Sequence, residues 1–329
     1  MNKRQLLALA LGAGLTRWAA PLGAQASSAP TLRHVGVLAP STGAREEITL
    51  KPFFDEMQRL GWVEGRSIVY DRAFADDRLD QIPRLATALV ARAPEVIYAP
   101  PATAAVAAHQ ATRSIPIVFG TGIDPVGMGL VASLARPGGN VTGVSSIAGS
   151  LAPKRVQLLR EIVPRARRIG FVGDTSDPTV RIEYAALEAL DPGLGLALVR
   201  ADASNAAEFD AAVARLIEQR VDAIFTEGSF SYNMRARLIE LTRGKHVPVV
   251  GHRSQMADAG ALFGYGASLV DQLRRSAQLV DKVLKGARPA DLPVEQPSVF
   301  ELVVNRRTAN AVGVTIPQSI LLRADRVIE

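Results

Sequence analysis

Short apolar runs alternate with amphipathic segments along most of this chain, and this alternation constrains its fold more than any other feature. Residues 35–39 form an apolar run of strand length, residues 46–60 form an amphipathic segment ending before Gly61, and residues 67–70 form the next run. An apolar run flanked by helical segments in this way is typical of a βαβ unit, in which a helix connects two parallel strands. The pattern therefore predicts an α/β fold with parallel sheets.

Several predicted helices have recognisable ends. Asp77 precedes an amphipathic segment and is predicted to cap it. Asn205 and Glu208 have the spacing of a capping box, in which each residue satisfies a free backbone N–H group. Residues 268–285 have the period of a helix with one apolar face, and Gly286 is predicted to end it.

The alternating pattern occurs twice. Residues 95–98 followed by 115–119 match residues 222–225 followed by 247–250 at a nearly constant separation along the chain. Two unrelated α/β halves also have similar strands, so the match by itself does not distinguish a duplication from chance similarity. It favours two lobes of like topology, joined near the small residues 143–150.

Polar residues follow the predicted strands, where open parallel sheets bind ligands. Hydroxyl groups and free helix N–H groups suit an anion such as a carboxylate, whereas carboxylates suit an amino group. On this basis Asp174 and Glu227 are candidates for an ammonium group. The complete set of candidate ligand-binding residues is Ser41, Thr42, Thr103, Asp124, Asp174, Ser176, Glu227 and Arg253.

Each candidate also has a structural interpretation. The hydroxyl residues are common helix caps and turn residues, and Asp124 stands before Pro125, where it is suited to cap a helix. Glu227 and Arg253 are the strongest candidates because a charge at a strand end inside a cleft needs a partner. They would also fit an ion pair with each other. We expect both to be hydrated in an empty cleft, so that their replacement weakens binding more than folding.

The sequence contains no motif that identifies a catalytic or a cofactor-binding site. The chain has no cysteine, which excludes disulfides and thiolate chemistry, and its four histidines lack metal-ligand spacing. Residues 127–132 match the dinucleotide pattern G-x-G-x-x-A, but no strand directly precedes them and no acid follows about 20 residues later. They are interpreted as a closely packed helix. The sequence predicts no metal, no cofactor and no enzymatic activity.

The N-terminal residues have the order of an export signal. Lys3 and Arg4 precede an apolar run at residues 6–15, and an A-x-A pattern ends at Ala26. The run is too short to span a membrane, and a buried N-terminal helix is the alternative. Removing residues 1–26 lowers the net charge from +6 to +3, which gives no case for a nucleic-acid partner. We expect a soluble, exported protein that leaves the cytoplasm by the Sec or the twin-arginine route.

Four strings in the second and last thirds of the chain are specific enough to indicate a family. They are IPIVF at 115–119, ARPGGNVTG at 135–143, DLPVEQP at 291–297 and IPQSILLRAD at 316–325. The chain resembles ABC transporter substrate-binding proteins of the tryptophan-binding-protein-like group. The resemblance implies a type I periplasmic-binding architecture, with two Rossmann-like lobes that close on a small solute for an inner-membrane ABC permease and its ATPase.

The resemblance also implies how the chain divides between the lobes. The first lobe is expected at residues 30–145 together with 266–297, and the second at residues 146–265 together with 298–329. Arg253 matches the family's cleft arginine. The expected function is a monomeric, non-enzymatic receptor for a small polar or amino-acid-like solute. A ligand-sensing partner of a membrane signalling protein is the alternative within this fold, and an exported α/β enzyme is the alternative outside it.

Overall fold

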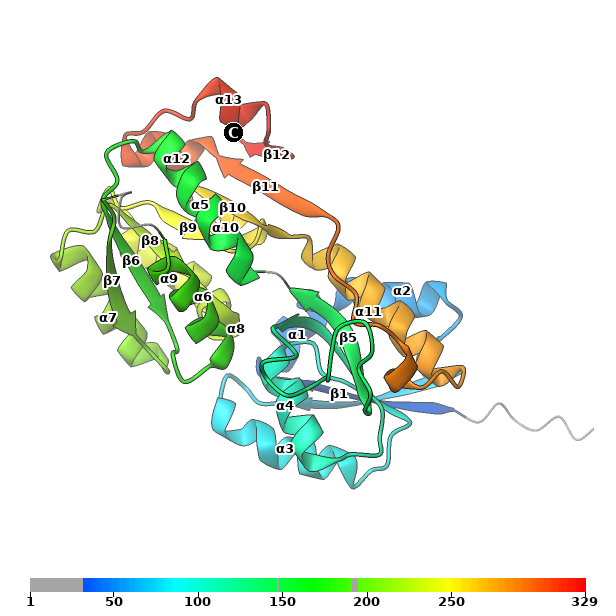
Figure 1. The fold of residues 1–329 in the computed structure, drawn as a ribbon. Coiled ribbons are helices and arrows are strands. Elements are labelled where there is room, and N and C mark those ends of the chain that lie inside the picture. Colours follow the sequence, from blue (N-terminus) through cyan, green and yellow to red (C-terminus); the bar gives the residue numbers. More distant parts are fainter. Residues whose placement is uncertain (1–31, 147, 191–194) are drawn as a thin grey trace, which may run out of the picture. The chain divides into compact units, whose positions relative to one another are not determined.

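The computed structural model describes residues 32–146, 148–190 and 195–329. The export signal expected at residues 1–26 lies outside this part of the chain. Two β-sheets form the centres of two α/β lobes, which we call the first and the second lobe (Figure 1). The chain passes from the first lobe to the second after β5, returns to the first after β10, and enters the second again before β11.

The first lobe has a five-stranded parallel sheet in the order β2-β1-β3-β4-β5. Helices α2 and α11 cover one face of this sheet, and α3 and α4 cover the other. Its elements are β1 (Arg33–Ala39), α1 (Gly43–Thr49), α2 (Lys51–Arg59), β2 (Ile68–Phe74), η1 (Leu79–Gln81), α3 (Ile82–Val90), β3 (Val96–Tyr98), α4 (Ala102–Ala111), β4 (Ile117–Ile123), β5 (Val141–Ser146), α11 (Leu269–Leu284) and η3 (Pro289–Asp291).

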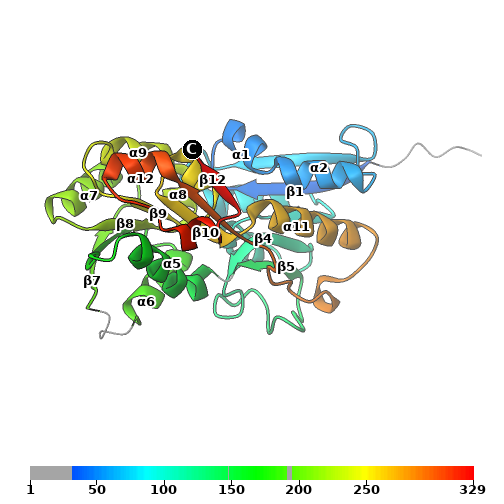
Figure 2. The ribbon, with the colours of Figure 1, turned by 90° about the horizontal axis from the view of Figure 1, so that it is seen from above.

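The second lobe has a seven-stranded sheet in the order β12-β11-β10-β9-β8-β6-β7. Helices α5, α6 and α13, together with Ala309 of α12, contribute to one hydrophobic core of this lobe, and α7, α9 and α10 contribute to the other. Figure 2 shows α5 and α6 on the side of the sheet away from α9. Its elements are α5 (Ala148–Ile162), β6 (Arg168–Gly173), α6 (Pro178–Glu188), β7 (Ala197–Asp202), α7 (Ala206–Glu218), β8 (Ala223–Thr226), α8 (Gly228–Asn233), α9 (Arg235–Thr242), β9 (Val249–Gly251), α10 (Gln255–Ala259), β10 (Phe263–Ala267), β11 (Phe300–Asn305), α12 (Arg306–Val312), α13 (Gln318–Leu321) and β12 (Arg326–Ile328).

The two sheets repeat one topology. The order β2-β1-β3-β4 in the first lobe corresponds to the order β7-β6-β8-β9 in the second. The prediction of two Rossmann-like lobes of like topology is therefore confirmed. Helix α11, which comes late in the chain, packs against α2 and β4 of the first lobe. Polar contacts hold it there, since Tyr98 Oη lies 3.0 Å from Ser276 Oγ and Trp62 Nε1 donates to Asp281 at 2.8 Å.

The second sheet departs from the parallel arrangement at one strand. β11 pairs antiparallel with β10, with Phe263 opposite Val304. The chain leaves the second lobe at the end of β10 and comes back from the first lobe at the same end of the sheet, so β11 has to run the opposite way. The alternation of strands and helices in the sequence does not predict the direction of β11, because that direction depends on which lobe α11 packs against.

Two of the predicted helix boundaries are wrong. The segment 46–60 is divided into α1 and α2, because Pro52 lies in the first turn of α2 and has no N–H group to continue the bonding of α1. Asp77 does not cap a helix: its φ is +63° and its carboxylate accepts a hydrogen bond from Arg45 Nη1 at 2.8 Å. The helix expected at residues 127–132 is also wrong, because turns and bends occupy these residues.

Two other helix ends are as predicted. Asn205 caps α7 and accepts the N–H of Glu208 at 3.1 Å, although the Glu208 carboxylate bonds to Ser204 rather than back to Asn205. α11 begins after its N-cap, Ser268, and ends before Gly286, whose φ is +98°. Within the described residues, no helix is both long enough and apolar enough to cross a membrane.

Candidate ligand-binding site

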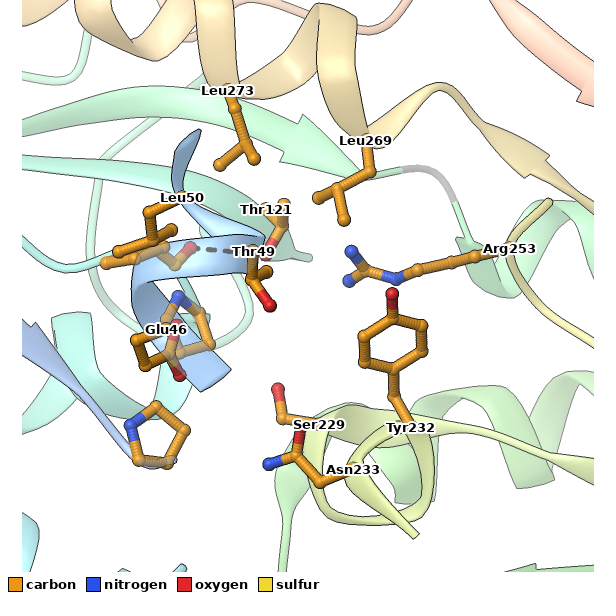
Figure 3. A pocket seen from close by; sticks show the side chains of 13 residues that line it. Glu46, Thr49, Leu50, Thr121, Ser229, Tyr232, Asn233, Arg253, Leu269 and Leu273 are labelled. Carbon is orange, nitrogen blue, oxygen red and sulfur yellow. Dashed lines mark hydrogen bonds between the residues drawn. The ribbon is translucent and has the colours of Figure 1, made fainter. Parts of the chain in front are cut away.

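A pocket lies between the two lobes, at the carboxyl ends of the strands, as expected for open α/β sheets (Figure 3). The space between its side chains is about 490 Å³, part of which is open to solvent. A smaller recess adjoins it and shares four of its residues, and we call the two together the interlobe pocket. From the first lobe it is lined by Pro40, Glu46, Thr49, Leu50, Pro100, Pro101, Ala102, Thr103, Thr121, Leu269 and Leu273, and from the second by Asp177, Glu227, Gly228, Ser229, Tyr232, Asn233 and Arg253.

The pocket has an apolar wall and a polar wall. Leu50, Leu269 and Leu273 of the first lobe form the apolar wall, and all three are buried (Figure 3). Helix α8 and the loop after β9 present Tyr232 and Arg253 opposite them. A pocket with one apolar side and a few fixed polar groups suits a small molecule that carries both an apolar and a charged part.

Arg253 is a half-buried cation at the centre of this polar wall. Its guanidinium lies 5.4 Å from the ring centroid of Tyr232, which provides a cation–π contact. Among the described residues no carboxylate lies within ion-pair distance of it. Arginine presents two parallel N–H groups that match a carboxylate, so the arrangement is suited to bind an anionic group of a ligand.

Two glycines of β10 make the position of Arg253 possible. A Cβ atom at Gly264 would lie 2.0 Å from the carbonyl oxygen of Arg253, and a Cβ at Gly266 would lie 2.0 Å from that of His252. The loop after β9 therefore packs directly on the backbone of β10. Only glycine allows this close approach of two backbones.

Glu227 is buried rather than hydrated, contrary to the expectation from the sequence. Its side chain is 3% exposed, and Oε2 lies 3.5 Å from Nη2 of Arg155, a buried residue of α5. Oε1 accepts the N–H of Gly228 at 3.2 Å and lies 3.7 Å from Nε2 of His252. Burial raises the pKa of Glu227, while the nearby Arg155 and the Gly228 bond lower it. Glu227 lines the recess but already has a partner inside the lobe.

His252 stands beside Glu227 and is uncharged. Burial lowers its pKa well below the usual range, and the neighbouring Arg253 and Arg155 act in the same direction. Its Nδ1 lies 3.1 Å from the carbonyl oxygen of Thr226, which identifies Nδ1 as the protonated nitrogen. His252 therefore contributes packing and a hydrogen bond rather than charge.

Glu46 is a lining residue that the sequence analysis missed. It lies on α1 and is 7% exposed, and the one hydrogen bond that it accepts within the described part of the chain is from the backbone N–H of Ser41, at 3.3 Å. Burial raises the pKa of Glu46 to about 7, with Ser41 and Arg45 acting against this. A signal was present in the sequence: Glu46 stands four residues before Leu50 and seven before Phe53, so the segment 46–60, taken as one helix, has a charged residue on its apolar face.

The remaining candidates from the sequence divide between the pocket and local turns. Thr103 lines the recess with Glu227 and Arg253. Ser41 is buried and accepts a hydrogen bond from Arg45 at 3.1 Å, and Thr42 precedes α1 without a side-chain cap bond. Neither residue lines the interlobe pocket.

The two aspartates proposed as ligand contacts bond within their own loops. Asp124 is exposed and accepts the N–H of Gly127 at 2.9 Å, without capping a helix. Asp174 is buried and accepts the N–H and the hydroxyl of Ser176, at 2.9 and 2.6 Å. These residues do not line the interlobe pocket either. The pocket instead includes Tyr232 and Asn233 of α8, a short helix for which the sequence offered no ligand-binding motif.

The described residues contain no group of three or more histidines, aspartates or glutamates that could hold a metal ion.

A family model described as ABC transporter substrate binding protein matches residues 34–328. The curated tyrosine-binding protein of Clostridioides difficile (strain R20291) is 26% identical over 263 residues, which covers 79% of this chain and 75% of that protein.

Solved structures show the same fold. An ABC domain from Streptococcus pneumoniae in complex with L-Trp superimposes with a TM-score of 0.83 at 24% identity, covering 91% of this chain and all of that one. A conserved domain protein from Vibrio cholerae O1 biovar El Tor gives a TM-score of 0.81 at 27% identity, covering 90% of this chain and 99% of that one. These matches and those to other solute-binding proteins show that the fold is that of type I periplasmic binding proteins.

Proposed function

Because the chain belongs to the family of ABC transporter substrate-binding proteins, we propose that it captures an amino-acid-like solute between its lobes and delivers it to an inner-membrane ABC permease and its ATPase. The family model and the curated relative from C. difficile both describe binding proteins, so the alternative of an exported enzyme is set aside. The observation that carries the proposal is Arg253, a cation that faces the interlobe pocket without a carboxylate partner among the described residues.

The lining of the pocket supports an amino-acid-like ligand. Arg253 would bind the carboxylate, and the leucines of the opposite wall would contact an apolar part of the solute. Tyr232 would add an aromatic surface beside the guanidinium. The tyrosine-binding protein of C. difficile, which matches most of this chain, supports the same class of ligand.

The cellular part of the proposal rests on the N-terminal sequence. Cleavage after Ala26 would release a monomeric protein into the periplasm, where a solute receptor has to act. Closure of the lobes around the solute would present both lobes to the permease. The intact mass of the exported protein tests the cleavage site, because a chain that starts near Ser27 is expected.

Binding is tested by a thermal-shift screen of the twenty L-amino acids, followed by calorimetry on those that raise the Tm. At least one is expected to bind, and Arg253→Ala is expected to weaken its binding by roughly 30-fold or more, because the ligand carboxylate is left desolvated and unpaired. Arg84→Ala, which removes an exposed arginine of α3 outside the pocket, is the control. Wild-type affinity in Arg253→Ala would place the ligand elsewhere.

A further inference from the structure

Glu46 is a buried carboxylate that the fold leaves with little to bind. It lies on the first-lobe side of the interlobe pocket, and Figure 3 shows it on the wall formed by α1. Its Oε1 accepts the N–H of Ser41 at 3.3 Å, and its Oε2 accepts no hydrogen bond from the described residues. A carboxylate buried this deeply is destabilising when it is ionised without a partner. Because Glu46 lines the interlobe pocket, a cationic group of a bound ligand can reach its carboxylate from the pocket.

The groups around Glu46 do not provide that partner. On α1, Arg45 donates to both carboxylate oxygens of Asp77, at 2.8 and 2.9 Å, so its guanidinium is paired with Asp77 rather than with Glu46. Asp77 itself, in the loop after β2, raises the pKa of Glu46. The buried Tyr98 of β3 is the nearby phenol, and its hydroxyl bonds to Ser276 of α11.

Across the pocket, the second lobe presents Arg253 and Tyr232 to the wall that contains Glu46. No ion pair joins Glu46 to Arg253. The pocket thus has a negative group on the first lobe and a positive group on the second, with the apolar leucine wall beside them. An amino acid in its zwitterionic form carries the complementary pair of charges.

We propose that Glu46 binds the cationic group of a zwitterionic solute whose carboxylate is bound by Arg253, so that each lobe holds one pole of the ligand. This inference rests on the proposed function and names the residue that selects the ammonium group. Glu227 is less suited to that role, because a ligand cation beside it would also face the buried guanidinium of Arg155 at 3.5 Å from the same carboxylate.

The proposal predicts that binding is linked to a proton. In the ligand-free protein the pKa of Glu46 is about 7, so the carboxyl is partly protonated at neutral pH. A bound ammonium group favours the ionised form, and the proton is then released. Affinity is expected to be highest above pH 7 and to fall by about tenfold per pH unit well below it, since the proton must first be removed.

The test compares Glu46→Gln with Glu47→Gln, which neutralises the next residue of the same helix. Glu47 is exposed and pairs with Arg72, outside the pocket. The probes are the L-amino acid that binds best in the screen, its desamino acid and its decarboxylated amine. For L-tyrosine these are 3-(4-hydroxyphenyl)propionate and tyramine.

The wild type and Glu47→Gln are expected to prefer the amino acid over both analogues. Glu46→Gln is expected to bind the amino acid roughly 30-fold more weakly or worse, and the desamino acid within about threefold of wild type. Its affinity for the amino acid should not change between pH 5 and 8. If Glu46→Gln keeps the wild-type preference for the amino acid, the inference is wrong while the proposed function stands. If the wild type binds no amino acid, the proposed function is overturned and the inference with it.

A measurement on the wild type alone keeps the inference testable if Glu46→Gln does not fold. Calorimetry at pH 7 in two buffers of different ionisation enthalpy reports the number of protons exchanged on binding. Release of a fraction of a proton is expected. Binding of the amino acid without proton release would overturn the role of Glu46.

Discussion

At the residue scale, a cluster of buried charges lies directly behind the interlobe pocket in the second lobe. Arg155 contacts Glu183 through an ion pair and Glu227 at 3.5 Å, and the three side chains are at most 3% exposed. Burial lowers the pKa of Arg155, with Glu227 acting against this. A buried cation between two carboxylates is stable only as a set, since each member compensates the desolvation of the others.

The first prediction concerns this cluster. Arg155→Met is expected to lower the free energy of unfolding by about 3–5 kcal/mol, because it leaves Glu183 and Glu227 buried without a cation. Denaturant unfolding at pH 7 measures the loss, and Arg84→Met on the surface of α3 is the control, expected within about 0.5 kcal/mol of wild type. A loss below about 1 kcal/mol in Arg155→Met would contradict the prediction. Glu183→Gln added to Arg155→Met should restore part of the loss.

At the element scale, the position of Arg253 depends on how two elements meet. The loop after β9 lies on the backbone of β10, and Gly264 is the point of closest approach. A side chain there would push the loop away from the strand. The element that carries the proposed carboxylate-binding residue is thus held by a strand that begins ten residues later in the chain.

Gly264→Ala is accordingly expected to weaken both folding and binding. The new Cβ would meet the Arg253 carbonyl at 2.0 Å, so the backbone has to move, at a cost of about 1–3 kcal/mol in unfolding free energy. The displaced guanidinium should also weaken solute binding, which calorimetry measures. Gly139→Ala is the matched control, because nothing lies within 4 Å of a Cβ at that position and its φ is not in the left-handed region. Wild-type affinity in Gly264→Ala would show that the loop tolerates displacement.

At the scale of the whole molecule, contacts from both lobes meet at the pocket. Asn233 of α8 donates to Asp77 of the first lobe at 3.1 Å, and Arg45 binds the same carboxylate. The charges proposed for the two poles of the ligand also come from different lobes. A solute that binds both would hold the lobes together, as in hinge closure of domains around a ligand.

Closure is tested by small-angle scattering of the full chain with and without a saturating amino acid from the screen. The radius of gyration is expected to decrease on binding in the wild type. Arg253→Ala, at a ligand concentration that still saturates it, is expected to show a smaller decrease, because only one lobe then holds a charged group of the ligand. An unchanged radius in the wild type, with binding confirmed by calorimetry, would show that one lobe alone binds the solute.

Much of the architecture follows from local patterns in the sequence. The alternation of apolar runs and amphipathic segments predicts two α/β lobes, and the cap Asn205 and the helix predicted at residues 268–285 are both present in the structure. These features depend on residues within a few positions of each other, so the sequence alone carries them. Pro52 was readable in the same way, although the segment 46–60 was interpreted as one helix.

Burial and long-range pairing were decided only by the tertiary structure. Glu227 follows a strand, as the sequence indicated, but its partner is Arg155 on α5, 72 residues earlier. Tyr232 enters the pocket because α8 packs beside the loop of Arg253, and the direction of β11 follows from the return of the chain out of the first lobe. The sequence determined most of the strands and helices and the loops that follow the strands. Which charges meet a partner depends on every element packed around them, and only the folded arrangement of both lobes sets that.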